Sequence, residues 1–494
     1  MVKQSTNKSY LLTFLVACIG AIFGVTAQDL ASPWQIKYNK DAEVLNLRSQ
    51  NMKHFRNQQG NFTAYVSSGS IHYKSGGQWL DIDNSVNSNT GTRHQNKPFV
   101  NTTNNFRTYY PANPFTESVL VEYNGNVFEE RITKIVFFDA QGNSISNLPI
   151  SDKIVGKVKG NQLVYKNVFN GVDLVFTQKN DGKKVDLVIN SSSFLQHIPS
   201  NASRIAIIEE VKLPNGVEVK NMNSGIEITK NNELLVTYTE PIAFETPSSN
   251  KQYNTDNDLA NSGILSYSKQ GDMLLINTSF DLNWLKDVKR SFPVRLDPSA
   301  NYGPFAVNLA TGYMTTATGG KTNGFLRLAN TNTFAWAKFN IGALASTGIT
   351  DVDSTRYWGY HYTSTGADKI AKIAGLANLD PVAGLNTAIV SQINAGPNYN
   401  NSYVFGGSAF QWRIGLLDTT LADTALLNSV ARGWFAIGMT YLTGNTGFMY
   451  QYGWNAGNAL INYLEVTYQT APCTNPVSSG SISGSVLVCG GSST

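Results

Sequence analysis

The stretch QLVYKNVFNGVDLVFTQKNDGKKVDLVI, residues 162–189, decides the fold class. Apolar and polar residues alternate through it in three short runs, which are separated by Asn170-Gly171 and Asp181-Gly182. An alternation with a period of two indicates a strand with one buried face, and Asn-Gly or Asp-Gly favours the tight turn of a hairpin. We therefore expect three consecutive strands joined by short turns.

The same pattern extends in both directions along the chain. Similar runs cover residues 119–122, 135–138, 205–211 and 234–238, and glycine-containing turns separate them. Helix-like patterns are confined to residues 423–431 and, interrupted by a glycine, 368–377. Short strands at regular spacing are typical of sandwiches and barrels. The chain is predicted to be all-β, with tandem β-sandwich or jelly-roll domains after a cleaved signal peptide.

The first 27 residues have the order of a secretory signal peptide. Lys3 and Lys8 precede an apolar run over 10–26, and small residues surround Ala27, the predicted last residue of the signal. The run is too short for a membrane anchor, so no membrane span is expected in the mature chain. A lipoprotein signal that ends before Cys18 is the alternative, although the residues after Cys18 are apolar.

A change in charge predicts the domain boundaries. Residues 28–300 carry 28 basic and 27 acidic side chains, whereas residues 301–470 carry 8 and 7. We predict an N-terminal β domain over 28–300, with a further division near 150–160, and a low-charge jelly-roll-like domain over 301–470. Residues 471–494 are uncharged and rich in Ser and Gly. They are predicted to be a linker or the truncated start of an Ig-like repeat.

Charge and cysteine content limit the kind of partner. The net charge is +4, of which Lys3 and Lys8 contribute two, and no basic block is present. A nucleic-acid partner requires clustered Lys and Arg, so none is expected. Apart from Cys18, the cysteines are Cys473 and Cys489, which are predicted to form a disulfide in an oxidising compartment.

Several motifs resemble the N-terminal β domains of large secreted Bacteroidota proteins. Residues 165–176, YKNVFNGVDLVF, are similar to the family pattern YxNVYPGVDLVF, and residues 185–189 fit its partner strand. Residues 76–83, GGQWLDID, and 292–298, FPVRLDP, resemble its GxWxDID and YPVxIDP signatures. The departure is Asn170, where the family has proline. An asparagine also suits a turn.

Two further resemblances concern the rest of the chain. Residues 336–341, 433–437 and 463–468 resemble a jelly-roll module found beside carbohydrate-active and cell-wall proteins. The C-terminal segment is similar to the first Ig-like repeat of giant flavobacterial adhesins, including the gliding-motility adhesin. This order of domains implies a protein secreted to the outer cell surface by the type IX route, whose C-terminal sorting domain is absent from this sequence.

Catalytic motifs are not recognisable. The five histidines are not arranged as HExxH, and no Gly-x-Ser-x-Gly elbow is present. His361, in an alternating aromatic run, is interpreted as a packed strand residue. We therefore predict that the chain is not an enzyme and needs no organic cofactor.

Ca²⁺ is the one ion for which the sequence offers ligands. Asp81 and Asp83 form an Asp-x-Asp pair near a turn, as do 256/258 and 351/353. Carboxylates at i and i+2 share one face of a strand and are oxygen ligands that Ca²⁺ prefers. Ordinary turn polarity is the simpler interpretation, because each pair supplies only two ligands.

Aromatic and hydroxyl side chains of the low-charge domain are candidates for carbohydrate contacts. The aromatic candidates are Trp358, Trp412, Trp434, Trp454, Tyr360 and Tyr450, of which Trp358, Tyr360, Trp434 and Trp454 are the chosen carbohydrate-binding residues. Most aromatics of an all-β domain belong to its core, so at most one or two are expected to bind. Ser354, Thr419 and Thr424 lie in motifs that resemble Bacteroidota O-glycosylation sites.

The sequence thus favours the N-terminal region of a cell-surface adhesin. It would attach to a surface or polysaccharide, or dock on cell-envelope proteins, in gliding motility or a related process. The alternative is an accessory carbohydrate-binding region of a secreted carbohydrate-active enzyme.

Overall fold

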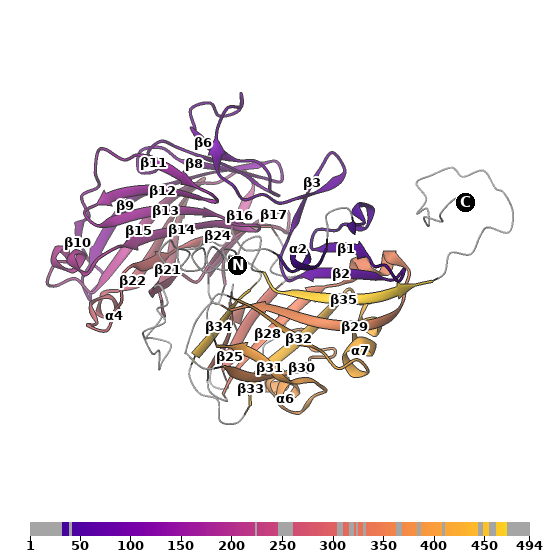
Figure 1. Ribbon diagram of the computed structural model, residues 1–494. Coiled ribbons are helices and arrows are strands. Elements are labelled where there is room, and N and C mark those ends of the chain that lie inside the picture. The colour runs from indigo at the N-terminus through magenta and orange to yellow at the C-terminus, as the bar shows by residue number, and fades with distance from the viewer. Residues whose placement is uncertain are drawn as a thin grey trace, which may run out of the picture.

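The computed structural model describes residues 32–38, 42–222, 225–245, 260–303, 310–315, 321–322, 325–329, 332–361, 368–382, 387–407, 411–442, 448–453 and 461–471. These residues form two β-sandwiches, which lie beside each other (Figure 1). The predicted all-β sandwich fold is confirmed. The predicted signal peptide and all of the C-terminal segment except residue 471 lie outside the described residues.

The first sandwich consists of two antiparallel sheets. One contains, in spatial order, β21 (Ile264–Gln270), β22 (Met273–Asp281), β15 (Arg204–Lys212), β9 (Asn126–Phe138), β8 (Val119–Tyr123), β7 (Arg107–Tyr110), β6 (Phe99–Asn101) and β5 (Asn87–Ser88), with β10 (Ser144–Asn147) beside β9. The other contains β11 (Gly156–Lys159), β12 (Gln162–Phe169), β13 (Val172–Gln178), β14 (Gly182–Ile189), β24 (Ser299–Tyr302), β18 (Glu233–Thr239), β17 (Gly225–Lys230) and β16 (Val217–Met222). Three shorter strands extend the second sheet: β23 (Val294–Asp297), β19 (Ile242–Glu245) and β20 (Ala260–Ser262).

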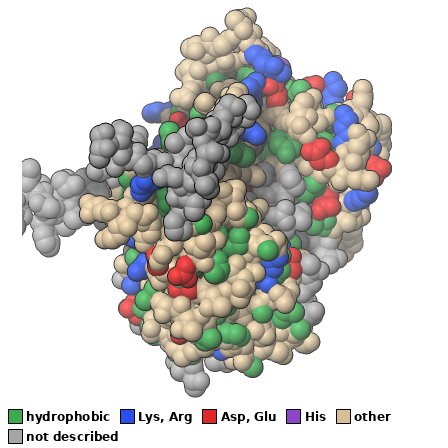
Figure 2. All heavy atoms as spheres, turned by 90° about the vertical axis from the view of Figure 1, so that its right-hand side faces the viewer, with side chains coloured by type: hydrophobic (Ala, Val, Ile, Leu, Met, Phe, Trp, Pro, Cys, Tyr) green, Lys and Arg blue, Asp and Glu red, His purple; other side chains and the backbone are tan. Residues whose placement is uncertain are grey.

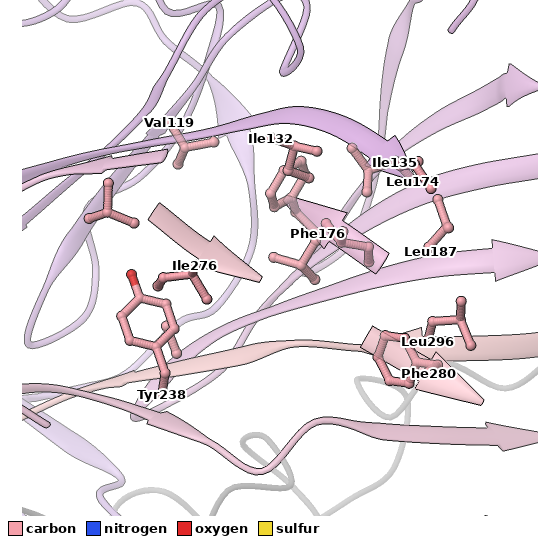
Figure 3. Close-up of a cluster of buried hydrophobic side chains, with 14 of the residues drawn as sticks. Val119, Ile132, Ile135, Leu174, Phe176, Leu187, Tyr238, Ile276, Phe280 and Leu296 are labelled. Carbon is pink, nitrogen blue, oxygen red and sulfur yellow. The ribbon is translucent and has the colours of Figure 1, made fainter. Parts of the chain in front are cut away.

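The stretch over residues 162–189 forms the expected strands β12, β13 and β14. Leu174 and Phe176 of β13 point into the core, where they meet Ile132 and Ile135 of β9 from the opposite sheet (Figure 3). Full burial of one such side chain stabilises the fold by about 1.5–3 kcal/mol. Gly182 is required at the start of β14, because a Cβ there would lie 2.3 Å from the Ala300 carbonyl oxygen of β24.

The predicted division of this domain near 150–160 is not observed. Strands from both sides of that point share a sheet, since β15 pairs with β9 along nine residue pairs. Both sheets enclose one hydrophobic core. Residues 87–147 contribute strands to one sheet only, and β15, β21 and β22 from the later residues complete that sheet, so the earlier part has no second sheet of its own to bury its apolar face.

The second sandwich also has two antiparallel sheets. The first contains β1 (Met52–Arg56), β2 (Phe62–Ser67), β35 (Tyr463–Thr470), β29 (Ile349–Tyr360) and β32 (Trp412–Leu416). The second contains β26 (Lys321–Thr322), β25 (Ala310–Thr315), β28 (Thr333–Asn340), β33 (Trp434–Tyr441), β30 (Lys369–Gly375) and β31 (Asn398–Gly406). Two two-stranded sheets stand apart from these: β27 (Phe325–Ala329) pairs with the distant β34 (Phe448–Tyr452), and β3 (His72–Ser75) forms a hairpin with β4 (Gln78–Asp81).

The structure differs from the predicted boundary at residue 300. Strands β1 and β2 were expected in the N-terminal domain, but β2 pairs with β35 along its whole length, and the two lie side by side in Figure 1. Met52, Ala64 and Val66 complete the core of the second sandwich. The charge difference could not reveal this exchange, because the two strands bury their inner faces irrespective of the charge of the sequence around them.

The helical segments are short: α2 (Pro33–Lys37), η3 (Leu45–Leu47), η4 (Ser192–His197), α4 (Leu282–Lys286), η5 (Gly342–Thr347), α6 (Thr387–Ala395) and α7 (Leu421–Ser429). The predicted helix at 423–431 corresponds to α7. The prediction of a helix at 368–377 is wrong: this stretch is β30, which pairs with strands on both sides. Nowhere in the described ranges is a helix long and apolar enough to cross a membrane.

A buried polar junction joins the two sandwiches. Ser68 donates its backbone N–H to the Asn462 carbonyl of the second sandwich. Two residues later, Ser70 accepts a bond of 2.5 Å from Asn180 and donates its N–H to Asp181 across 3.4 Å, both in the β13–β14 turn of the first sandwich. The segment between β2 and β3 therefore contacts both sandwiches within three residues.

Candidate functional site

The outer face of the sheet β1–β2–β35–β29–β32 carries a cluster of aromatic side chains. Trp34, which lies in α2, packs edge-on against Tyr463 of β35 with ring centroids 5.1 Å apart. Tyr38 stacks on Phe55 of β1 at 4.7 Å. The segment around α2 therefore covers the β1, β2 and β35 part of this face.

Glu465 of β35 is the polar centre of the same face. Its side chain is only 2% exposed, yet it receives Lys37 at 2.7 Å and Arg356 at 3.2 Å. The indole Nε1 of Trp358 donates to its second oxygen at 2.9 Å. A buried carboxylate is tolerated when it is paired and hydrogen-bonded in this way. Through Lys37, Glu465 holds the α2 segment on the sheet.

Beyond the covered part, strand β32 presents a stripe of apolar side chains. Ile414 and Leu416 are 52% and 48% exposed, and Trp412 of the same face is partly exposed. We call these three residues the β32 stripe. The strand turns this face outward because Gly415 packs inward on Tyr403, where a Cβ would lie 2.7 Å from the ring.

The structure differs from the predicted carbohydrate-binding residues. Trp358 and Tyr360 are 7% and 1% exposed, and they pack beside Trp412 from the neighbouring strand β29, with ring centroids at 6.1 and 5.2 Å. Trp434 lies against two cations, the Arg432 guanidinium at 4.0 Å and the Lys338 ammonium at 5.0 Å. Trp454 lies outside the described residues.

The β32 stripe was not singled out from the sequence, although Trp412 was among the aromatic candidates. In the run WRIGL, the alternation of Trp412, Ile414 and Leu416 indicates a buried face. The outward orientation of these three side chains depends on how closely Gly415 approaches Tyr403 of β31, and this contact is visible only in three dimensions. Figure 2 shows that uncharged and hydrophobic atoms predominate over the lower part of the molecule, which is the second sandwich.

The predicted calcium pair is already occupied by protein cations. Asp81 contacts Lys53, and it also pairs with Arg48 at 3.1 Å and with His72 at 3.4 Å. Partial burial opposes ionisation, but these three groups outweigh it and hold the pKa of Asp81 well below its usual range. Asp83 instead accepts the Ser85 backbone N–H. Across the described residues, no group of three His, Cys, Asp or Glu side chains is placed to hold a metal ion.

The remaining predicted sites differ in accessibility. Thr419 and Thr424 are exposed, and Ser354 is partly buried, where its hydroxyl accepts a bond from Arg356. Cys473 and Cys489 lie outside the described residues, so their disulfide stays a prediction. His361 is fully buried, and desolvation followed by the nearby Arg413 charge lowers its pKa to about 4. His361 lies directly after β29 and forms an isolated bridge with Gln451.

A second group of polar and charged side chains lies in the core of the first sandwich and was missed by sequence reasoning. The ammonium of Lys183 in β14 lies 2.5 Å from Oε2 of Glu130 in β9 and 4.0 Å from Glu209 in β15. The phenols of Tyr302 and Tyr238 donate to the other oxygen of Glu130 at 2.5 and 3.3 Å. We call these five residues the Lys183 cluster.

The signal for this cluster was present in the strand pattern. Lys183 has the same parity as Val185 and Leu187, and Glu209 has the same parity as Ile207 and Val211. A charged residue at an inward position of an alternating strand predicts a buried charge that needs a partner.

The electrostatics of the Lys183 cluster follow from its burial. Burial raises the pKa of Glu209 to about 7. The charge of Lys183 opposes this rise, and the charge of Glu130 adds to it. The same desolvation acts to lower the pKa of Lys183, but the charges of Glu130 and Glu209 outweigh it and leave that pKa raised.

Taken together, the fold and these sites define an all-β protein of two interlocked sandwiches with one partly exposed apolar stripe. No protein-family model matches the chain. The chain is 29% identical over 156 residues to a wall-associated protein of Geobacillus stearothermophilus, a match that covers 31% of this chain and 59% of that protein. It is 23% identical over 268 residues to the tRNA nuclease WapA of Bacillus subtilis, which covers 53% of this chain and 10% of that protein.

Among solved structures, an exo-β-1,3-galactanase from Phanerochaete chrysosporium is similar over 81% of this chain and 100% of that one, at 8% identity. Its TM-score of 0.15 is too low to indicate a shared arrangement of strands. The similarity to wall-associated proteins therefore comes from the sequence comparison alone.

The prediction that the chain is not an enzyme is contradicted by the same comparison. Three of the relatives are named as tRNA nucleases. A search for catalytic motifs within the chain was too narrow a basis for that prediction, because the chain corresponds to about a tenth of those proteins.

Proposed function

We propose that this chain forms the cell-surface region of a wall-associated protein and attaches to neutral polysaccharide of the cell envelope through the β32 stripe. The observation that carries the proposal is the stripe itself, in which Trp412, Ile414 and Leu416 present half-exposed apolar surface on one strand. Exposed contiguous apolar residues mark interaction sites more often than isolated ones do.

The surroundings of the stripe favour a neutral ligand. Residues 301–470 carry only 8 basic and 7 acidic side chains. Arg356, opposite Leu416, pairs with Glu465, and Arg413 of β32 pairs with Asp368. Sugar rings have apolar C–H faces that pack against aromatic and aliphatic side chains, and they need no ionic partner. The support of Trp412 by Trp358 and Tyr360 fixes its ring without loss of side-chain entropy on binding.

Cosedimentation of the purified protein with isolated wall polysaccharide tests the proposal. We expect Trp412→Ala and Ile414→Ser each to reduce the bound fraction. Ile264→Ser is the matched control, since Ile264 is a 55% exposed isoleucine at the sheet edge of the first sandwich. Binding that is unchanged in both stripe variants, or lost equally in the control, would refute this surface.

The finer hypothesis of a gliding-motility-like adhesin, exported by the type IX route, is compatible with this role. A coding sequence that continues past Thr494 into Ig-like repeats and a sorting domain would support it. The relatives named as nucleases are compatible with the proposal too, because a surface-attachment region forms only a small part of such long proteins.

A further inference from the structure

The Lys183 cluster places a nucleophile, an electrophile and a proton-transferring group together in a dry core. Lys183, Glu130 and Glu209 are all at least nine-tenths buried, and they come from three strands of the two facing sheets. Charges of this kind are costly to bury even when they are paired. A reaction that removes two of the charges would remove that cost.

We propose that Lys183 and Glu130 condense spontaneously into an amide that covalently joins β14 to β9. The 2.5 Å approach of Nζ to Oε2 holds the amine beside the carboxyl carbon, as an intramolecular reaction requires. The resulting bond would link the two sheets of the first sandwich through their common core.

The tyrosines are placed to stabilise the reacting carboxyl group. Both phenols donate to Oε1 of Glu130, Tyr302 at 2.5 Å and Tyr238 at 3.3 Å. When Nζ adds to the carbon, negative charge develops on Oε1. Donors that already point at this oxygen in a water-excluded site act as an oxyanion hole.

The step balances with loss of one water molecule. One proton passes from Nζ to Oε2, and the freed lone pair of the amine forms the N–C bond at Cδ of Glu130. Glu209 gives its proton to the departing Oε2 hydroxyl as the C–O bond breaks, and it takes the second proton from Nζ. Glu209 ends as it began, so it acts as a general acid and base. Its raised pKa of about 7 lets it hold and release a proton near neutral pH.

A tryptic digest of the denatured full-length protein, analysed by mass spectrometry, tests the proposal directly. Trypsin does not cleave after an amide-linked lysine, so the linked product is residues 108–131 joined to residues 180–184, lighter than the sum of the two peptides by one water. We expect this product, with fragmentation placing the link on Glu130 and not on Glu129. Recovery of residues 108–131 as a free peptide, together with cleavage after Lys183, in the wild-type protein would overturn the proposal.

Variants test the roles of the individual groups. Lys183→Arg keeps the positive charge and should abolish the product. Glu209→Gln should slow its formation by about 100-fold or more, the usual contribution of a general acid and base. Glu129→Gln is the control, because Glu129 is exposed and pairs with Lys212 at the surface. A product formed at the wild-type rate in Glu209→Gln would refute the role of Glu209, and the wild-type digest decides the proposal even where a variant does not fold.

Discussion

Asp181 at the junction of the two sandwiches makes the stability of the protein depend on pH. Its carboxyl is fully buried in the β13–β14 turn, where it accepts the backbone N–H of Ser70 at 3.4 Å. Burial raises its pKa from the ordinary 3.8 to about 7, although the bonds from Ser70 oppose the shift. The folded protein therefore keeps a proton that the unfolded chain releases.

The sign and size of the effect follow from this difference. Between pH 4 and 7 the native state binds more protons at Asp181 than the unfolded state does, so the free energy of unfolding falls as pH rises. A difference of about three pH units, at 1.36 kcal/mol per unit, corresponds to roughly 4 kcal/mol lost above pH 7. Below pH 4 the contribution of Asp181 is fully present.

The substitution Asp181→Asn removes this titration and nearly preserves the shape of the side chain. We expect the difference in unfolding free energy between variant and wild type to shift by roughly 4 kcal/mol in favour of the variant from pH 4 to pH 8. Any constant cost of placing an amide there leaves that shift unchanged. Urea unfolding followed by circular dichroism at several pH values measures it, and comparison with wild type cancels Glu209 and Asp423, whose pKa values are also raised. A pH-independent difference would refute the reasoning.

Three further predictions concern the second sandwich. Glu465→Gln should lower the free energy of unfolding by about 1–3 kcal/mol, because Lys37 and Arg356 lose their buried carboxylate partner. The control Glu129→Gln, at an exposed ion pair, should change the free energy of unfolding by less than about 0.5 kcal/mol. Equal melting temperatures for these two variants would contradict the role of Glu465. Gly415→Ala should cost about 1–3 kcal/mol through overpacking against Tyr403 and should weaken binding by the β32 stripe, as read from a thermal melt and the cosedimentation assay. A fragment of residues 301–471 lacks β1 and β2, so it should show no cooperative unfolding transition in calorimetry. Fusion of residues 42–67 to this fragment should restore the transition. A cooperative transition in the fragment without residues 42–67 would show that the shared sheet is dispensable.

Local patterns predicted the strands but could not predict which sheets they join. Residues 162–189 formed the expected strands because alternation and turn residues act over a few positions. The pairing of β2 with β35 is different, since both strands would satisfy their pattern in any sandwich with a free edge. Burial of β30 between two partner strands likewise overrode its helix-like spacing.

The candidate sites show the same limit. Trp358 and Tyr360 belong to a run of aromatics whose two faces look alike in the sequence, yet both side chains are buried beside Trp412. Asp81 was predicted near a turn, but its cationic partners are Arg48, directly after η3, and Lys53 of β1. By contrast, the inward parity of Lys183 was readable from the sequence.

The sharing of a sheet between the first and last strands also sets an order in which the protein can be completed. His54 of β1 hydrogen-bonds Tyr468 of β35 across 414 positions of sequence. At roughly 5–20 residues per second, a ribosome would need about 20–80 s to supply the second partner after the first. An isolated two-stranded hairpin is marginal in water, and β1–β2 would expose Met52 and Val66 for that time. Strands β1 and β2 are thus among the last to reach their native contacts, and they need protection from aggregation until residue 470 has emerged.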